Sequence, residues 1–400
     1  MGITLFEGEL YNDYKAIESM EHYDMNAINQ KYEAGQARIV TEQGAFKLPL
    51  LETIFKQENY KLRPDFQRRL TWDNRAKSKL IESFIINVPV PPVFIYEYDF
   101  DKYEVMDGLQ RISSIIDFYK NNFALIGLDE WPELNGLYYN ELPEKIREGI
   151  DRRQLPSITM LKESAKSILQ AQNFKKMVFE RLNTGGVKLE PQEIRNALYD
   201  GKFNKLCIEL SANDSFRKTW DIKISTTNQE ELGAELFENT EEVLQFEKNK
   251  LYMRMYDVEI VLRYFAMRHL TDFTGQLSLF LDNVLKSGNL YSDDLLDKLR
   301  NQFNSTINKA DKIFGDKVFC QWKKNKWTYP QRFIYDPMMI ALTALNLEKE
   351  DFDIAANQEL LKQFYLKHED SDLFNGRKQL KADIEKRVQH FFDFISGLDG

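Results

Sequence analysis

The chain has 400 residues, of which 43% are hydrophobic and 13% aromatic, so it has material for the cores of two or three domains. Its formal net charge of -9 excludes a histone-like protein that coats DNA indiscriminately, because sequence-independent phosphate binding depends on abundant lysine and arginine. Cys207 and Cys320 lie far apart and form no CxxC pair. Neither a disulfide framework nor a zinc ribbon is therefore predicted.

The N-terminal sequence and the distribution of charge indicate where the protein acts and what it could bind. The first ten residues are mixed and acidic, and no run approaches the roughly 18 apolar residues of a membrane-spanning helix, so we predict a cytoplasmic protein without membrane contact. Residues 63–79 hold six basic residues against two aspartates, whereas residues 229–247 hold seven glutamates and no lysine or arginine. This segregation of charge suits one anion-binding face.

The first predicted elements precede residue 60. Residues 12–33 are polar and aromatic with weak helical spacing, and residues 37–48 are typical of a short extended segment. Apolar side chains at helical spacing predict a helix over residues 48–57. We interpret residues 1–45 as an N-terminal extension.

A helix and a strand are predicted next. Residues 74–87 carry one apolar stripe, with Asp73 as the N-cap, and the proline-rich residues 88–92 end this helix. Residues 93–98 form a β-branched and aromatic run of the length of a buried strand.

A second strand over residues 103–106 pairs with the first across a polar turn, which makes a hairpin. Asp107 and Gly108 interrupt this strand, and residues 110–120 then return to helical spacing. The residues between the strand and the helix therefore lie at a strand-to-helix junction.

The remainder of the chain turns from mixed to helical. A short strand is predicted over residues 155–160, and the spacing is helical beyond Pro191. We predict an α+β protein, in which an α/β domain with a small mixed sheet, residues 46–215, precedes an all-helical domain, residues 216–400. The clearest helices of the second domain are predicted over residues 251–269, 277–285, 294–314, 336–347 and 380–395.

The junction Asp107-Gly-Leu-Gln-Arg111 is the first candidate site. A helix N-terminus presents unpaired backbone N–H groups and the positive end of its dipole, which together bind anions. Gly108 permits the tight turn, and Arg111 can hold phosphate oxygens in bidentate fashion. Asp107 could hold a metal ion, orient a water molecule or only cap the helix, so the alternative interpretation is an ordinary capped turn.

A second cluster precedes the helix predicted over residues 74–87. Gln67, Arg68 and Arg69 lie between Phe66 and Trp72, where guanidinium and amide groups suit phosphates or base edges and an aromatic ring can stack on a base. The alternative is a solvated basic loop with the tryptophan as a core anchor. The basic side chains predicted to contact nucleic acid are Arg69, Lys77 and Lys79.

A third cluster follows residue 180. Asn183 and Thr184 precede two glycines, and Arg195 and Asn196 lie on the next predicted helix. The alternative is a glycine C-cap followed by an N-capped helix. The three clusters occur at the ends of short strands and helices, where α/β domains commonly bind ligands.

The order of these motifs resembles the N-terminal domain family of GmrSD-type restriction endonucleases, which belongs to the ParB/sulfiredoxin-like superfamily. The usual family core is Asp-Gly-Gln-Gln-Arg, and this chain has Leu109 at the third place. The resemblance extends from about Leu48 to Tyr199. Its motifs are Phe66-Gln-Arg, Trp72, Val88-Pro-Val-Pro-Pro, Asp107-Gly-Leu-Gln-Arg, Phe179-Glu-Arg-Leu-Asn-Thr-Gly and Glu193-Ile-Arg-Asn.

The resemblance implies nucleotide binding and nucleoside-triphosphate hydrolysis in a bacterial defence against phage or modified foreign DNA. Phosphoryl transfer normally uses Mg²⁺, for which Asp107 is the candidate ligand. The residues that match the family core and could act in catalysis are Asp107, Gln110 and Arg111. The expected nucleotide-binding set is Gln67, Arg68, Gly108 and Arg111, to which Asn183, Thr184 and Arg195 are added from their placement.

Family members often carry a C-terminal HNH nuclease domain, but the four histidines of this chain show no paired spacing. We therefore expect DNA as a partner and a separate nuclease subunit for cleavage; homo-oligomerisation is also compatible with the sequence. Two alternatives stay open: a DNA-binding or modification-sensing module without hydrolysis, and a metal-dependent DNA nickase. The histidines are His22, His269, His368 and His390.

One basic cluster lies in the helical half. Residues 323–327, Lys-Lys-Asn-Lys-Trp, are a candidate for phosphate contact. The alternative is a surface loop. The tryptophans and the many other aromatic residues of this half are interpreted as core or partner interface.

Overall fold

The computed structural model describes residues 3–14, 29, 39–62, 72–164, 171, 174, 177, 178, 181, 190–222, 250–345, 351–369, 371–374 and 376–398. The chain divides into two compact units, and each is described by itself. The sheet unit contains the described residues from 29 to 198. The helical unit contains residues 3–14, 199–222 and the described residues from 250 onward.

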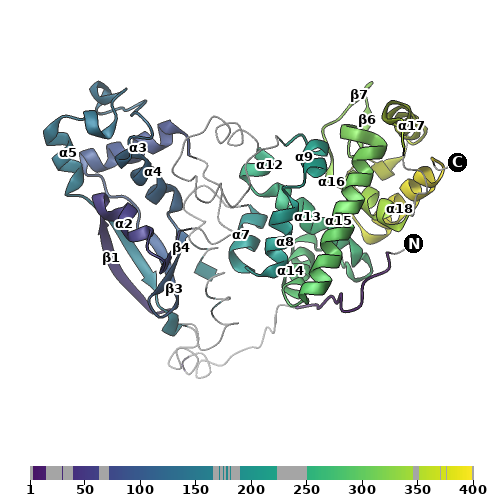
Figure 1. Cartoon of the computed structure of the whole chain (residues 1–400), viewed down its shortest axis with the longest axis horizontal. Coiled ribbons are helices and arrows are strands. Elements are labelled where there is room, and N and C mark those ends of the chain that lie inside the picture. The colour runs from purple at the N-terminus through teal and green to yellow at the C-terminus, as the bar shows by residue number, and fades with distance from the viewer. Residues whose placement is uncertain are drawn as a thin grey trace. The chain divides into compact units, whose positions relative to one another are not determined.

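A mixed sheet of five strands forms the centre of the sheet unit (Figure 1). β1 and β5 are antiparallel, β5 and β3 are parallel, β3 and β4 are antiparallel, and β4 and β2 are parallel. The prediction of an α+β fold with a small mixed sheet is confirmed. In spatial order the strands are β1 (Thr41–Lys47), β5 (Gln154–Met160), β3 (Val93–Asp99), β4 (Lys102–Asp107) and β2 (Tyr60–Lys61).

Helices cover one face of this sheet (Figure 1). Alternate residues of the strands, such as Ile95 and Val105, pack there against Phe84, Ile112 and Phe118 of the helices, all of them buried. The helices of the unit are α2 (Leu51–Phe55), α3 (Asn74–Ile86), α4 (Leu109–Tyr119), α5 (Glu144–Asp151) and α7 (Pro191–Leu198), with short 3₁₀ turns η1 (Leu48–Leu50), η2 (Pro132–Leu134), η3 (Tyr139–Glu141) and η4 (Lys162–Ser164).

The opposite side chains of the same strands form a second, smaller cluster. Tyr96, Met106 and Met160 pack together with Phe174. Both faces of the central strands are therefore covered, which accounts for the nearly continuous apolar sequence of β3.

The helical unit consists largely of helices, as predicted. Its long helix α15 has an apolar stripe that includes Leu299, Phe303 and Ile307, all buried. Its elements are α8 (Lys202–Leu210), α9 (Asp214–Thr219), α12 (Lys250–Met253), α13 (Tyr256–Arg268), η6 (Leu270–Asp272), α14 (Leu277–Gly288), α15 (Asp293–Phe314), η7 (Gly315–Lys317), β6 (Trp322–Lys323), β7 (Lys326–Trp327), α16 (Arg332–Ala344), α17 (Ile354–Lys367), η8 (Asp372–Phe374) and α18 (Lys381–Ser396).

Two details differ from the sequence prediction. The helix predicted over residues 251–269 is divided into α12 and α13, because Met255 adopts a left-handed conformation with φ of 56°. The basic cluster over residues 323–327 is a β-hairpin, so this half of the chain is not entirely helical.

The N-terminal residues 3–14 pack on the helical unit. The carboxylate of Glu9 accepts hydrogen bonds from Arg268 Nε and Nη2, each at 2.6 Å, and both side chains are buried. The hydroxyl of Tyr291 donates to the backbone carbonyl of Leu10 at 2.8 Å. In the part of the chain that the structure describes, no helix is both long and apolar enough to cross a membrane.

Candidate functional site

The turn between β4 and α4 requires a glycine at position 108. Gly108 has φ of 103°, in the left-handed region that side chains rarely adopt. A Cβ atom at this position would overlap Val93 Cγ1, and would lie 2.9 Å from Val93 Cβ and 3.2 Å from Val93 Cα. The first residue of β3 therefore closes tightly over the turn that leaves β4.

Asp107 does not cap the helix. The N-cap residue of α4 is Gly108, which has no side chain to cap this helix end, and the first turn contains no acidic residue. Asp107, the last residue of β4, instead pairs with Arg111 in the first turn of α4. The backbone N–H groups at the start of α4 and the positive end of its dipole therefore attract an anion, because Asp107 does not cap them.

The guanidinium of Arg111 is fixed by three hydrogen bonds. Nη1 donates to the backbone carbonyls of Pro91 at 2.5 Å and Pro92 at 3.1 Å, and Nη2 donates to Asp107 Oδ2. A guanidinium has five N–H donors. Two of them therefore make no hydrogen bond to the described residues, and the Arg111 side chain is 12% exposed.

Gln110 fixes the chain that enters α3. Its side-chain Oε1 accepts a hydrogen bond from the backbone N–H of Trp72 at 3.2 Å. Trp72 is the last residue of the second predicted cluster, so the structure brings the end of that cluster to the turn. The other members of the cluster named in the predictions, Gln67, Arg68 and Arg69, lie outside the described residues, as do Asn183 and Thr184.

Arg195 lies in the interior of α7. Its side chain is buried, and Nη1 donates to Gln192 Oε1 at 3.3 Å. The side-chain amide of Gln192 in turn donates to Asn196 Oδ1 at 2.8 Å. The contact of Arg195 with a nucleotide stays a prediction.

Lys77 is engaged within the sheet unit. Its Nζ lies 2.9 Å from Asp117 Oδ2 on α4, and the two side chains are only 13% and 9% exposed. The same ammonium lies 5.5 Å from the ring centroid of Phe123. Lys77 therefore joins α3 to α4.

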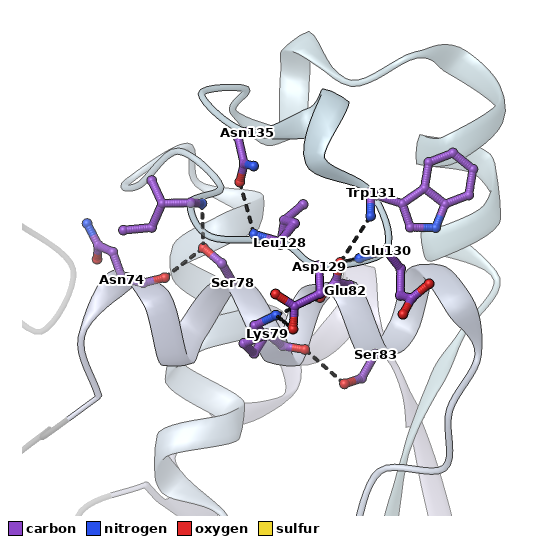
Figure 2. Close-up of polar contacts among 11 residues, drawn as sticks. Asn74, Ser78, Lys79, Glu82, Ser83, Leu128, Asp129, Glu130, Trp131 and Asn135 are labelled. Atoms are coloured by element: carbon purple, nitrogen blue, oxygen red, sulfur yellow. Dashed lines mark hydrogen bonds and ion pairs between the residues drawn. The ribbon is translucent and has the colours of Figure 1, made fainter.

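Lys79 belongs to a polar network that holds the loop after residue 125 (Figure 2). It pairs with Asp129 of that loop and lies 3.3 Å from Glu82 Oε2. The ion pair with Asp129 raises the pKa of Lys79. The buried Glu82 accepts hydrogen bonds from the backbone N–H groups of Glu130 at 2.8 Å and Trp131 at 3.2 Å. The network positions this loop on α3.

The donor set at the turn suits a magnesium ion that is shared with a ligand. The Asp107 side chain is 50% exposed. Among the described residues there is no group of three or more histidine, cysteine, aspartate or glutamate side chains that could hold a metal ion. Mg²⁺ is commonly held by one or two carboxylates together with substrate phosphates and water, and one accessible carboxylate fits that arrangement.

Sequence reasoning missed several groups that shape the turn. Pro91 and Pro92 act through their backbone carbonyls, and Asp117 neutralises Lys77 from 40 residues away. No local pattern identifies such tertiary partners. The spacing of Lys79 and Glu82, three residues apart on one helix, was the one signal that could have revealed a pairing.

Comparison with known families finds one match. Residues 51–199 match the family model of the GmrSD restriction endonuclease N-terminal domain, and this stretch of the chain is a domain of that family. The chain therefore contains a domain that belongs to a restriction system. No curated protein and no solved structure matches the sequence.

Proposed function

We propose that the Asp107 to Arg111 turn binds the phosphates of a nucleoside triphosphate together with Mg²⁺. We propose further that the chain hydrolyses this nucleotide as part of a restriction or defence system that acts on foreign DNA. The observation that carries the proposal is the guanidinium of Arg111, which is fixed in the first turn of α4 and has two donors that make no hydrogen bond to a described residue.

The electrostatics of the turn favour a phosphate. The start of α4 is the positive end of its dipole, and its first turn contains no acidic side chain. Arg111 is already ordered by the carbonyls of Pro91 and Pro92, so little conformational entropy is lost when it binds a phosphate.

Binding of a magnesium nucleotide exchanges the partners of Asp107 and Arg111. Asp107 would hold the metal ion, and the Nη2 group of Arg111 that donates to Asp107 would instead donate to a phosphate oxygen. The exchange leaves the guanidinium of Arg111 with an anionic partner, since the phosphate takes the place of the half-exposed Asp107 carboxylate. Asp107 would hold Mg²⁺, which would supply neutralisation of the phosphate charge, and Arg111 would stabilise the charge that develops on the transferred group.

The nucleotide state then controls engagement of DNA, and a separate nuclease subunit makes the cut. This role places the protein in the cytoplasm with the DNA. The family match supports the restriction context, and the geometry of the turn supports the anion site.

Phosphate release from a panel of nucleoside triphosphates with Mg²⁺ tests the hydrolysis. Arg111→Lys keeps the positive charge but loses the planar fork, and we expect it to lower release at least about tenfold. Asp99→Asn is the matched control, since Asp99 is 47% exposed, paired with Lys162, and lies at the opposite end of the β3 and β4 hairpin. Equal release by both variants would contradict the assignment.

Two other outcomes identify the alternatives. Salt-dependent DNA binding that no nucleotide alters, without phosphate release, supports a DNA-binding module without hydrolysis. Plasmid nicking that survives Arg111→Lys and stops in EDTA supports a metal-dependent nickase.

A further inference from the structure

The β6 and β7 hairpin carries three lysines that have no acidic partner among the described residues. Lys323, Lys324 and Lys326 are exposed, and none of them makes an ion pair with a described residue. Six other lysines of the helical unit pair with carboxylates: Lys202 with Asp293, Lys218 with Asp311, Lys298 with Asp294, Lys317 with Asp316, Lys362 with Glu359 and Lys378 with Asp372. The hairpin therefore concentrates unneutralised positive charge in a protein with a net charge of -9.

The hairpin is held firmly on the helical unit. Trp322 pairs with Trp327 across the two strands, and their rings meet edge to face with centroids 5.4 Å apart. The Gln321 side chain donates to the backbone carbonyl of Phe374 at 2.9 Å. At the tip, Lys324 and Asn325 have φ of 52° and 58°, as the two central residues of a tight hairpin turn require.

We propose that this hairpin is a contact surface for duplex DNA. The major groove of B-DNA is about 12 Å wide and admits a two-stranded β-ribbon. Lys323 and Lys326 face each other across the ribbon and bind phosphates, and the tip residues Lys324 and Asn325 enter the groove. The inference takes DNA as the partner from the proposed function, but does not depend on the nucleotide site.

One carboxylate opposes the lysines. A hollow of about 100 Å³ lies beside the hairpin, and its lining includes Lys323, Lys324 and Glu369. Glu369, just beyond the end of α17, is exposed. Its negative charge weakens the attraction to phosphate, so Glu369→Gln should tighten duplex binding.

The test is duplex binding by the full chain with all three hairpin lysines changed to glutamine. Loss of the two phosphate contacts of Lys323 and Lys326 lowers the slope of log K against log salt by about 1.8, so a fourfold rise in salt costs the wild-type chain about 12-fold more affinity than the variant. The matched control changes Lys202, Lys298 and Lys386 to glutamine, which removes the same charge from exposed sites of the same unit. We expect this control to keep the wild-type slope.

Several outcomes overturn the proposal. These are an unchanged slope in the hairpin variant, an equal loss in both variants, or a loss of binding to anionic phosphatidylserine vesicles without a loss of DNA binding. Circular dichroism establishes that the hairpin variant is folded. Binding of magnesium nucleotide is also measured on the hairpin variant, and we expect it to stay unchanged. The two measurements are independent, so failure of this inference is distinguishable from failure of the nucleotide proposal.

Discussion

Substitution of Gly108 by alanine tests how the chain forms the turn at the candidate site. An alanine there must keep φ near 103°, and its Cβ must also displace Val93, a fully buried residue of β3. Gly136, in the same unit, has φ of 91°, and a Cβ added there would meet no atom within 4 Å. The pair Gly108→Ala and Gly136→Ala thus separates the backbone strain from the steric clash.

The expected magnitudes follow from these two contributions. A side chain in a sparsely populated backbone region costs about 1–3 kcal/mol, and both variants incur this cost. Overpacking against a buried neighbour costs about 1–3 kcal/mol more, and only Gly108→Ala incurs it. We therefore expect Gly108→Ala to lower the free energy of unfolding of the sheet unit by about 2–6 kcal/mol in total.

Urea unfolding followed by hydrogen exchange of peptides from β3 and α4 measures the sheet unit separately, which matters because the chain has two units. Adding Val93→Ala removes the closest atoms, so the double variant should be more stable than the sum of the two single effects predicts. Equal destabilisation by Gly108→Ala and Gly136→Ala, or strict additivity with Val93→Ala, would refute the reasoning.

Three further predictions concern stability. Glu82→Gln weakens charge-assisted hydrogen bonds to the loop backbone, so it should lower the free energy of unfolding by about 1–3 kcal/mol and speed hydrogen exchange over residues 128–134. The control Glu133→Gln changes an exposed side chain and should leave the exchange unchanged. Arg263→Met leaves the carboxylate of Asp336 buried without its partner, so the free energy of unfolding measured in urea should fall by about 3–5 kcal/mol. The double variant Arg263→Met with Asp336→Leu should regain most of that stability, and a double variant as unstable as Arg263→Met alone would contradict this. Burial lowers the pKa of His269 below 6.5, so the unfolded chain binds more protons than the folded chain just below that pH. The free energy of unfolding should therefore fall more steeply below about pH 6.5 in the wild type than in His269→Gln, and parallel pH profiles would exclude this histidine as the cause.

The secondary structure near the site could be predicted because its signals are local. The N-cap of α3 is one example: Asp73 accepts a hydrogen bond from the backbone N–H of Ala76 at 2.8 Å, as the sequence predicted. The alternating and helical spacings likewise placed β3, β4 and α4 within about one residue of their observed bounds. The division of the predicted helix at Met255 had no such local signal.

The site itself could be predicted only in part. Asp107 and Arg111 were both named as candidate site residues from the sequence, but the ion pair between them was not predicted. The carbonyls of Pro91 and Pro92 come from the loop before β3, and only the packed fold brings them to Arg111. The same limit applies to Lys77. The sequence predicted that Lys77 contacts nucleic acid, whereas the fold places it beside Asp117.

Calorimetric titration of the full chain with a panel of nucleoside triphosphates, each with Mg²⁺, tests the central claim most directly. We expect at least one nucleotide to bind, and Asp107→Asn to weaken this binding at least about tenfold, or 1.4 kcal/mol, while Asp99→Asn leaves it unchanged. No binding by any nucleotide, or equal affinities for Asp107→Asn and the wild type, would contradict the assignment of the turn as a magnesium nucleotide site.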